Sequence, residues 1–149
     1  MRHLLVTGTL ALLLFPALVR ADAPPTQYDP YLSTDELIVD RNTGYSWERA
    51  VSKNAVPLSQ VKCPPNGTRV PTVKELATLL DNEPRKVLVG LEAKDLHIDQ
   101  NAFPRTPPAL FWTSSVTPAG EVFVVDFSTG VVMPVPKNSS AYVRCLQRN

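Results

Sequence analysis

The chain has 149 residues, of which 44% are hydrophobic and 7% aromatic, and this composition fits one globular domain rather than two domains or a disordered tail. The charge is nearly balanced, with 15 Lys and Arg against 14 Asp and Glu. This balance argues against a nucleic-acid-binding protein, because such proteins normally carry a strongly basic domain or face.

The first 21 residues have the pattern of a secretory signal peptide. A basic start at Arg2 precedes an apolar run over residues 4–18, and Ala21 offers a small-residue cleavage site. About 15 apolar residues fall short of the roughly 20 that a membrane-spanning helix needs. We therefore expect cleavage near Ala21, a mature form without a membrane span, and a secreted or periplasmic location. Loss of the two arginines of this segment takes the 15 Lys and Arg to 13, against 14 Asp and Glu.

The next segments indicate a leader and then a hairpin. Residues 22–35 are rich in proline and polar side chains, which predicts an extended leader and places the domain at 36–149. Residues 37–39 and 45–47 are β-prone, and the turn residues between them include a glycine able to take positive φ. Residues 50–67 hold three prolines and an Asn-Gly dipeptide, so a short helix at most is expected there.

A helix start is marked at Thr72. Glu75 follows three residues later, which is the spacing of a capping box. An apolar stripe then recurs at helical spacing, through Val73, Leu76, Ala77 and Leu80. Because no second amphipathic helix of equal clarity is present, we expect this helix to pack on a sheet.

The second half of the chain predicts that sheet. β-prone or alternating runs occur at residues 110–112, 122–127, 131–133 and 142–146. Alternation in the last run places Val143 and Cys145 on one face and Arg144 on the other. In an oxidising compartment Cys63 and Cys145 are expected to form a disulfide, which would staple the loop before the helix to the last strand. A reactive or metal-binding pair is the alternative, although the sequence has no C-x-x-C.

Several motifs in order resemble the Lcl C-terminal domain family. They are D-x-x-T-G-x-x-W at 40–47, Cys63, R-V-P-T-V-K-E-L at 69–76, I-D-x-x-A-F-P at 98–104, F-W-T-S-S at 111–115, V-D-F-S-T-G at 125–130 and Y-V-R-C at 142–145. The family is named for the C-terminal domain of a bacterial collagen-like adhesin. The resemblance implies an α+β, C-type-lectin-like fold, with a small twisted antiparallel sheet packed by one main helix, long loops and one disulfide. It also implies a binding role. Where the family usually has Trp-Arg-Leu-Pro-Thr, this chain has Thr-Arg-Val-Pro-Thr at 68–72, and no collagen-like repeat precedes the domain.

Residues with chemical potential are sparse. His97 is the single histidine after residue 21, and no nucleophile motif accompanies it. Six residues in the loop region that follows the helix are candidates for ligand binding: Asp81, Glu83, Arg85, Asp95, His97 and Asp99. Their carboxylates suit calcium, but the Glu-Pro-Asn and Trp-Asn-Asp motifs of calcium-dependent lectins are absent. We therefore expect no metal or cofactor, with calcium as the alternative.

Two further groups of residues leave a structural and a functional interpretation open. Trp47 and Trp112 lie inside apolar strands, which favours core packing over sugar stacking. Six basic residues would form a patch for a sulfated polysaccharide if they converged: Arg69, Lys74, Arg85, Lys86, Arg144 and Arg148.

The leading functional hypothesis is a secreted or periplasmic, non-catalytic binding module. Its loops at 81–108 and 114–121 would contact an extracellular glycan or an envelope protein. The first alternative is a structural component of an envelope assembly without a small-ligand site. The second is an enzyme like the formylglycine-generating enzymes, whose chemistry depends on reactive cysteines. The sequence does not fix the oligomeric state.

Overall fold

The computed structural model describes residues 24, 26–65 and 67–148. The expected signal peptide lies outside these residues. Within the described part of the chain, no helix is long and apolar enough to cross a membrane.

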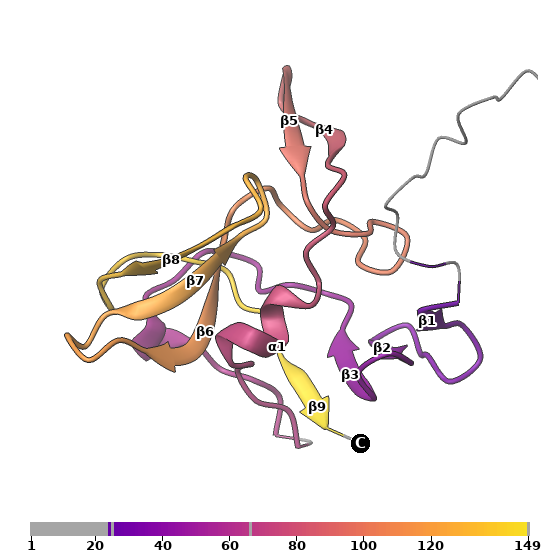
Figure 1. Ribbon diagram of the computed structural model, residues 1–149, viewed down its shortest axis with the longest axis horizontal. Coiled ribbons are helices and arrows are strands. Elements are labelled where there is room, and N and C mark those ends of the chain that lie inside the picture. The colour runs from indigo at the N-terminus through magenta and orange to yellow at the C-terminus, as the bar shows by residue number, and fades with distance from the viewer. Residues whose placement is uncertain (1–23, 25, 66, 149) are drawn as a thin grey trace, which may run out of the picture.

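The strands form three small antiparallel sheets rather than the single sheet expected (Figure 1). Four strands pair in the order β1-β2-β3-β9, two in β4-β5, and three in β6-β7-β8. Their bounds are β1 Tyr28–Asp29, β2 Leu37–Asp40, β3 Tyr45–Glu48, β4 Arg85–Val89, β5 Glu92–Leu96, β6 Leu110–Val116, β7 Val122–Asp126, β8 Val131–Val135 and β9 Leu146–Arg148. The described helical elements are a 3₁₀ turn at Leu58–Gln60 and the helix α1 at Val73–Ala77. The fold is therefore mostly sheet and loop, with a much smaller helical part than expected.

The predicted β2–β3 hairpin is present. Asp40 fixes its turn, because its carboxylate accepts hydrogen bonds from the Asn42 amide and the Thr43 hydroxyl, both at 2.9 Å. Gly44 has a φ of 72°, the left-handed conformation that glycine adopts without steric cost. β1 pairs with β2 on its outer side, so the sheet takes in residues upstream of position 36, where the sequence placed the start of the domain.

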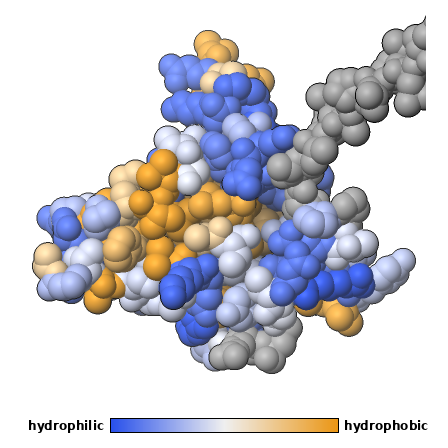
Figure 2. Space-filling view, viewed as in Figure 1, coloured by the Kyte–Doolittle hydropathy of each residue, from blue (hydrophilic) through white to orange (hydrophobic). Residues whose placement is uncertain are grey.

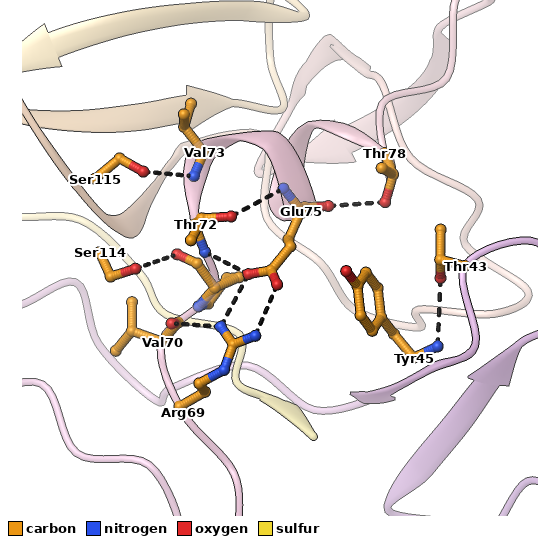
Figure 3. Close-up of polar contacts among 11 residues, drawn as sticks. Thr43, Tyr45, Arg69, Val70, Thr72, Val73, Glu75, Thr78, Ser114 and Ser115 are labelled. Carbon is orange, nitrogen blue, oxygen red and sulfur yellow. Dashed lines mark hydrogen bonds and ion pairs between the residues drawn. The ribbon is translucent and has the colours of Figure 1, made fainter. Parts of the chain in front are cut away.

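The predicted capping box is also present at the start of α1 (Figure 3). The Glu75 amide donates to the Thr72 hydroxyl at 3.3 Å, and the Glu75 carboxylate accepts from the Thr72 amide at 2.7 Å. The helix has only five residues. Beyond it the chain tightens to three residues per turn, with the Leu79 amide bonded to the Leu76 carbonyl at 3.1 Å. This tightening buries Leu79 and leaves Leu80, which the helical period placed in the stripe, only partly buried.

The β6-β7-β8 sheet packs on both faces. Phe111, Val125 and Phe127 belong to the main core, whereas Val124 and Trp112 belong to a second, smaller core. Helix α1 contacts β6 and β7, as the sequence predicted for a helix that needs a sheet. Each tryptophan is fully buried, which confirms core packing.

The disulfide joins Cys63 to Cys145, with 5.8 Å between the two Cα atoms. Next to it, Arg69 and Leu146 exchange two backbone hydrogen bonds, each of 2.9 Å. The loop that enters α1 is therefore fastened to the C-terminal segment by a covalent bond and by a bridge. The predicted strand at 142–146 is wrong in its position, since β9 begins at Leu146. Before it, Ala141 and Tyr142 make isolated bridges, to Val56 and to Phe111.

Residues 85–96, expected to lie in a long loop, form the β4–β5 hairpin instead. It projects from the rest of the fold (Figure 1), and Figure 2 shows hydrophobic side chains at its tip. Leu88 and Leu91 are 79% and 101% exposed there. Gly90, with a φ of 64°, starts the two-residue turn between the strands.

Candidate functional site

Several of the six candidate ligand-binding residues lie near the base of the β4–β5 hairpin. The Asp81 amide donates to the His97 carbonyl, and the His97 Nδ1 lies 3.0 Å from the Asp81 carbonyl oxygen. These contacts fasten the end of the α1 segment to the residue that follows β5. The Asp81 carboxylate is buried and accepts from the Glu83 amide at 3.1 Å.

The other candidates lie on the hairpin or just beyond it. Arg85 begins β4 opposite Leu96, the neighbour of His97, and the Asp95 carboxylate pairs with Lys86 at 2.7 Å. Asp99 accepts a hydrogen bond of 2.8 Å from the Asn101 amide. Among the residues that the structure describes, no group of three or more His, Cys, Asp or Glu is placed to hold a metal ion.

The six basic residues do not all meet in one surface patch. Arg144 is completely buried, so it contributes nothing to the surface. Arg69 makes a bidentate pair with Glu75, with distances of 2.8 and 2.7 Å (Figure 3). Lys86 lies on the hairpin in its pair with Asp95. These side chains stabilise different parts of the fold.

Two adjoining pockets offer a different candidate site. The first, here called the basic pocket, has a volume of about 350 Å³, and the second, the acidic pocket, of about 510 Å³. Residues 50–52 and Asp35 line both pockets, so the two are neighbours. Volumes of this size suit small organic ligands or single sugar units.

Positive charge dominates the basic pocket. Arg49, Lys53 and Arg105 line it, against the single carboxylate of Asp35. The remaining lining combines small and apolar groups with one aromatic ring: Ala50, Val51, Ser52, Pro104, Pro107 and Tyr142. The pocket therefore offers cationic groups beside rigid proline rings and a tyrosine ring.

Negative charge dominates the acidic pocket. Asp35, Glu36 and Glu48 line it, against Lys62. Burial raises the pKa of the Glu48 carboxyl, and the nearby Glu36 carboxylate raises it further, although the Cys145 amide and Arg144 act in the opposite direction. The Cys145 amide donates to this carboxylate at 3.1 Å.

Arg144 is buried and binds two of the segments that line these pockets. Its Nη1 donates to the carbonyl of Glu48 and, at 2.8 Å, to that of Arg49, while its Nη2 donates to the Thr106 hydroxyl at 2.7 Å. The guanidinium also lies over the Phe103 ring, 4.6 Å from its centroid. Burial lowers the pKa of Arg144 to about 9, so the side chain stays charged at neutral pH. One buried cation thus joins the segment 48–50 to the segment 103–106.

Arg105 is held in an uncommon backbone conformation. Its φ is 60°, in the left-handed region that costs a non-glycine residue about 1–3 kcal/mol. Phe103 and Thr106 on either side are buried, and the Thr106 hydroxyl donates to the Phe103 carbonyl at 2.8 Å. This anchoring leaves the Arg105 side chain exposed at the mouth of the basic pocket.

Arg49 has a more structural position. Its guanidinium donates to the carbonyls of Thr34, Asn101 and Ala102, at distances between 3.2 and 3.4 Å. By contrast, across the described ranges, Lys53 and Arg105 form no ion pair. Their charges are therefore available to a ligand.

Sequence reasoning missed both pockets. Their charged residues come from segments far apart in the chain, around positions 35, 49, 62 and 105. The local signal that existed was the proline-rich run at 104–108, which lies in one of the predicted binding loops, although Arg105 was not among the candidates. The contacts of Arg144 and of Arg49 help to bring these segments together.

Comparison with known proteins identifies the family. No curated protein and no solved structure matches the chain. Residues 36–147 match the family model described as the Lcl C-terminal domain. This match covers all the strands from β2 to β8, the helix, the disulfide and nearly all the residues that line the two pockets. The chain therefore belongs to the Lcl C-terminal domain family.

Proposed function

We propose that this protein is a non-catalytic binding module that acts outside the cytoplasm and binds an acidic glycan in the basic pocket. The observation that carries the proposal is the convergence of Lys53 and Arg105, both without an ion pair in the described part of the chain, on a pocket that has a single carboxylate. A carboxylate or sulfate group of a glycan supplies the missing negative charge.

The apolar lining favours a sugar over a free inorganic anion. Pro104, Pro107 and Tyr142 border the pocket beside the cations, and such flat or ring-shaped groups pack against the C-H faces of a sugar ring. The Tyr142 ring is held in place by Phe111, with 5.7 Å between the ring centroids. A binding surface that is already ordered loses little entropy when the ligand binds.

An extracellular or periplasmic location agrees with three features. The sequence begins with a signal-peptide pattern, the two cysteines are joined, and the family takes its name from an adhesin. Disulfides persist in oxidising compartments. The C-type-lectin-like fold, which the resemblance implies, is common in extracellular binding domains and belongs to the same proposal.

The disulfide also weighs against the enzymatic alternative. A catalyst that works like the formylglycine-generating enzymes needs reactive thiols, and both cysteines of this chain are consumed by the disulfide. Cys145 is moreover 1% exposed. These features support a binding role without chemistry.

The test is a titration of the purified protein with uronic-acid-containing oligosaccharides and with neutral oligosaccharides of the same length. We expect saturable binding of the acidic series only, weakened by salt. Replacement of Arg105 by Gln or of Lys53 by Gln removes one charge-assisted contact and is expected to weaken binding about tenfold. Arg49 is not substituted in this test, because its guanidinium donates hydrogen bonds to backbone carbonyls.

Lys74→Gln is the matched control, because Lys74 is an exposed lysine on α1, away from both pockets. It should leave the affinity unchanged. Equal loss in Lys74→Gln and in the pocket variants, or equal affinity for acidic and neutral sugars, would refute the basic pocket as the binding site.

A further inference from the structure

The acidic pocket has an excess of negative charge. Its carboxylates outnumber its one cation, whereas the neighbouring pocket has the opposite excess. Among the described residues, the side chains of Asp35, Glu36 and Lys62 form no ion pair with one another or with the basic pocket. The opposite charges of the two pockets therefore do not pair with each other.

Two carboxylates of this pocket, Glu36 and Glu48, repel each other. Burial disfavours the charged form of Glu48, the Cys145 amide and Arg144 favour it, and Glu36 adds a smaller unfavourable effect. Glu48 cannot turn away easily, because its carboxylate accepts the Cys145 amide hydrogen and its backbone carbonyl accepts from Arg144. A cationic group placed in the acidic pocket would relieve this repulsion and gain hydrogen bonds to the carboxylates.

The two pockets share part of their lining. Both are lined by Ala50, Val51, Ser52 and Asp35, so a single segment of chain borders both. Ser52 anchors this segment to Val143. Its hydroxyl accepts a hydrogen bond of 3.1 Å from the Val143 amide, and its amide donates to the Val143 carbonyl at 3.3 Å. The border between the pockets is thus fixed to the buried C-terminal segment, and the two charge excesses keep their relative position.

We propose that the acidic pocket is a second subsite, which takes the free amino group of a hexosamine while the basic pocket takes the acidic group of the neighbouring sugar. The ligand is then a zwitterionic glycan with adjacent amino and acidic sugars. This inference rests on the proposed function, because it assigns the acidic group to the basic pocket. It adds that the amine, and not only the acid, determines which glycans bind.

The test uses two oligosaccharides with the same alternating glucuronic acid and glucosamine backbone. In one the glucosamine amine is free and protonated, and in the other it is N-acetylated and neutral. We expect the wild-type protein to bind the free-amine form about tenfold more tightly, the effect of one charge-assisted hydrogen bond. Isothermal titration calorimetry at low salt measures both affinities.

Matched variants separate the two pockets. Glu36→Gln removes one charge from the acidic pocket and keeps the side-chain volume, so it should abolish the preference for the free amine while the N-acetylated form still binds. Arg105→Gln should weaken both forms and preserve the preference. Lys74→Gln should change neither.

The ways in which the proposal could fail are distinguishable. If both oligosaccharides bind equally and Arg105→Gln weakens them, the basic pocket stands and the second subsite is refuted. If Glu36→Gln leaves the preference intact, the amine does not lie in the acidic pocket. If neither oligosaccharide binds but a peptide of alternating Lys and Glu does, the glycan assignment is wrong for both pockets.

Discussion

Arg144 is a completely buried cation whose hydrogen bonds connect parts of the chain that are far apart in sequence. Its guanidinium donates to carbonyls in the segment 48–50 and to the Thr106 hydroxyl, and it lies against Phe103. A buried charge is costly unless hydrogen bonds and opposite charge compensate it, and here several carbonyl groups provide that compensation. The side chain therefore holds together two of the segments that line the pockets.

Replacement of Arg144 by Met is expected to lower the free energy of unfolding by about 3 kcal/mol, because the carbonyls that it binds lose their buried partner. Urea denaturation measures this change. Lys86→Met is the control, since Lys86 pairs with Asp95 at 2.7 Å and both side chains are exposed, at 69% and 39%. Exposed pairs contribute about 1 kcal/mol or less. If the two variants lost the same stability, the buried network would have no special role.

Local sequence could not reveal the position of Arg144. The predicted alternation placed it on the face opposite Cys145 and implied a surface residue, because arginine is rarely buried without partners, but residues 143–145 form no strand and are all buried. Those partners are carbonyls about 95 positions earlier, as the separations of 96, 95 and 94 residues to Glu48, Arg49 and Ala50 show. Backbone carbonyls carry no sequence signature, so only the folded chain identifies them.

At the scale of the elements, short-range signals were the reliable ones. The β2–β3 turn and the capping box of α1 depend on side chains within a few residues of the backbone they bind, and both were predicted. The β4–β5 hairpin was missed although it had a local signal, a β-branched run with Gly90 at the turn. The sequence analysis treated charged residues of this region as ligand-binding candidates in a loop, but cross-strand pairing, such as that of Lys86 with Asp95, supports the hairpin.

Helix α1 has five residues and is too short to be stable alone, so its contacts hold it in place. Glu75 is central to them, as it completes the capping box and pairs with Arg69. The hydrogen bonds from Arg69, followed by those from Thr72, lower the pKa of Glu75 from 4.5 to about 2. The folded state thus binds this proton less readily than the unfolded state does.

The sign of the pH effect follows from this difference. The stabilisation is complete above the unfolded pKa of 4.5 and is lost as the pH falls from there toward about 2. We expect the wild-type protein to lose about 2 kcal/mol more than Glu75→Gln over this range. Urea denaturation at roughly pH 6, 4 and 3 measures the difference, since these values span the upper part of the window. Parallel pH profiles for the two proteins would contradict the role of Glu75.

At the scale of the whole molecule, the fold divides its apolar residues between two cores and its strands among three small sheets. The larger core contains Trp47 from the β1-β2-β3-β9 sheet and Phe111 from the β6-β7-β8 sheet, so these two sheets pack against each other through it. Small sheets are marginal alone, because each buries little surface. Connections between distant segments therefore matter more here than in a fold with one continuous sheet.

The disulfide is the strongest such connection, and its removal gives the last prediction. It links residues 82 positions apart, a separation for which the chain-entropy model gives about 4 kcal/mol. The double variant Cys63→Ala with Cys145→Ala should lose a comparable free energy of unfolding, and wild-type protein unfolded in reductant should match it. Hydrogen exchange should accelerate first at the amides of Arg69 and Leu146, whose mutual backbone bonds adjoin the disulfide. Slow exchange at these amides after removal of the disulfide would mean that the surrounding packing alone fixes the loop before α1.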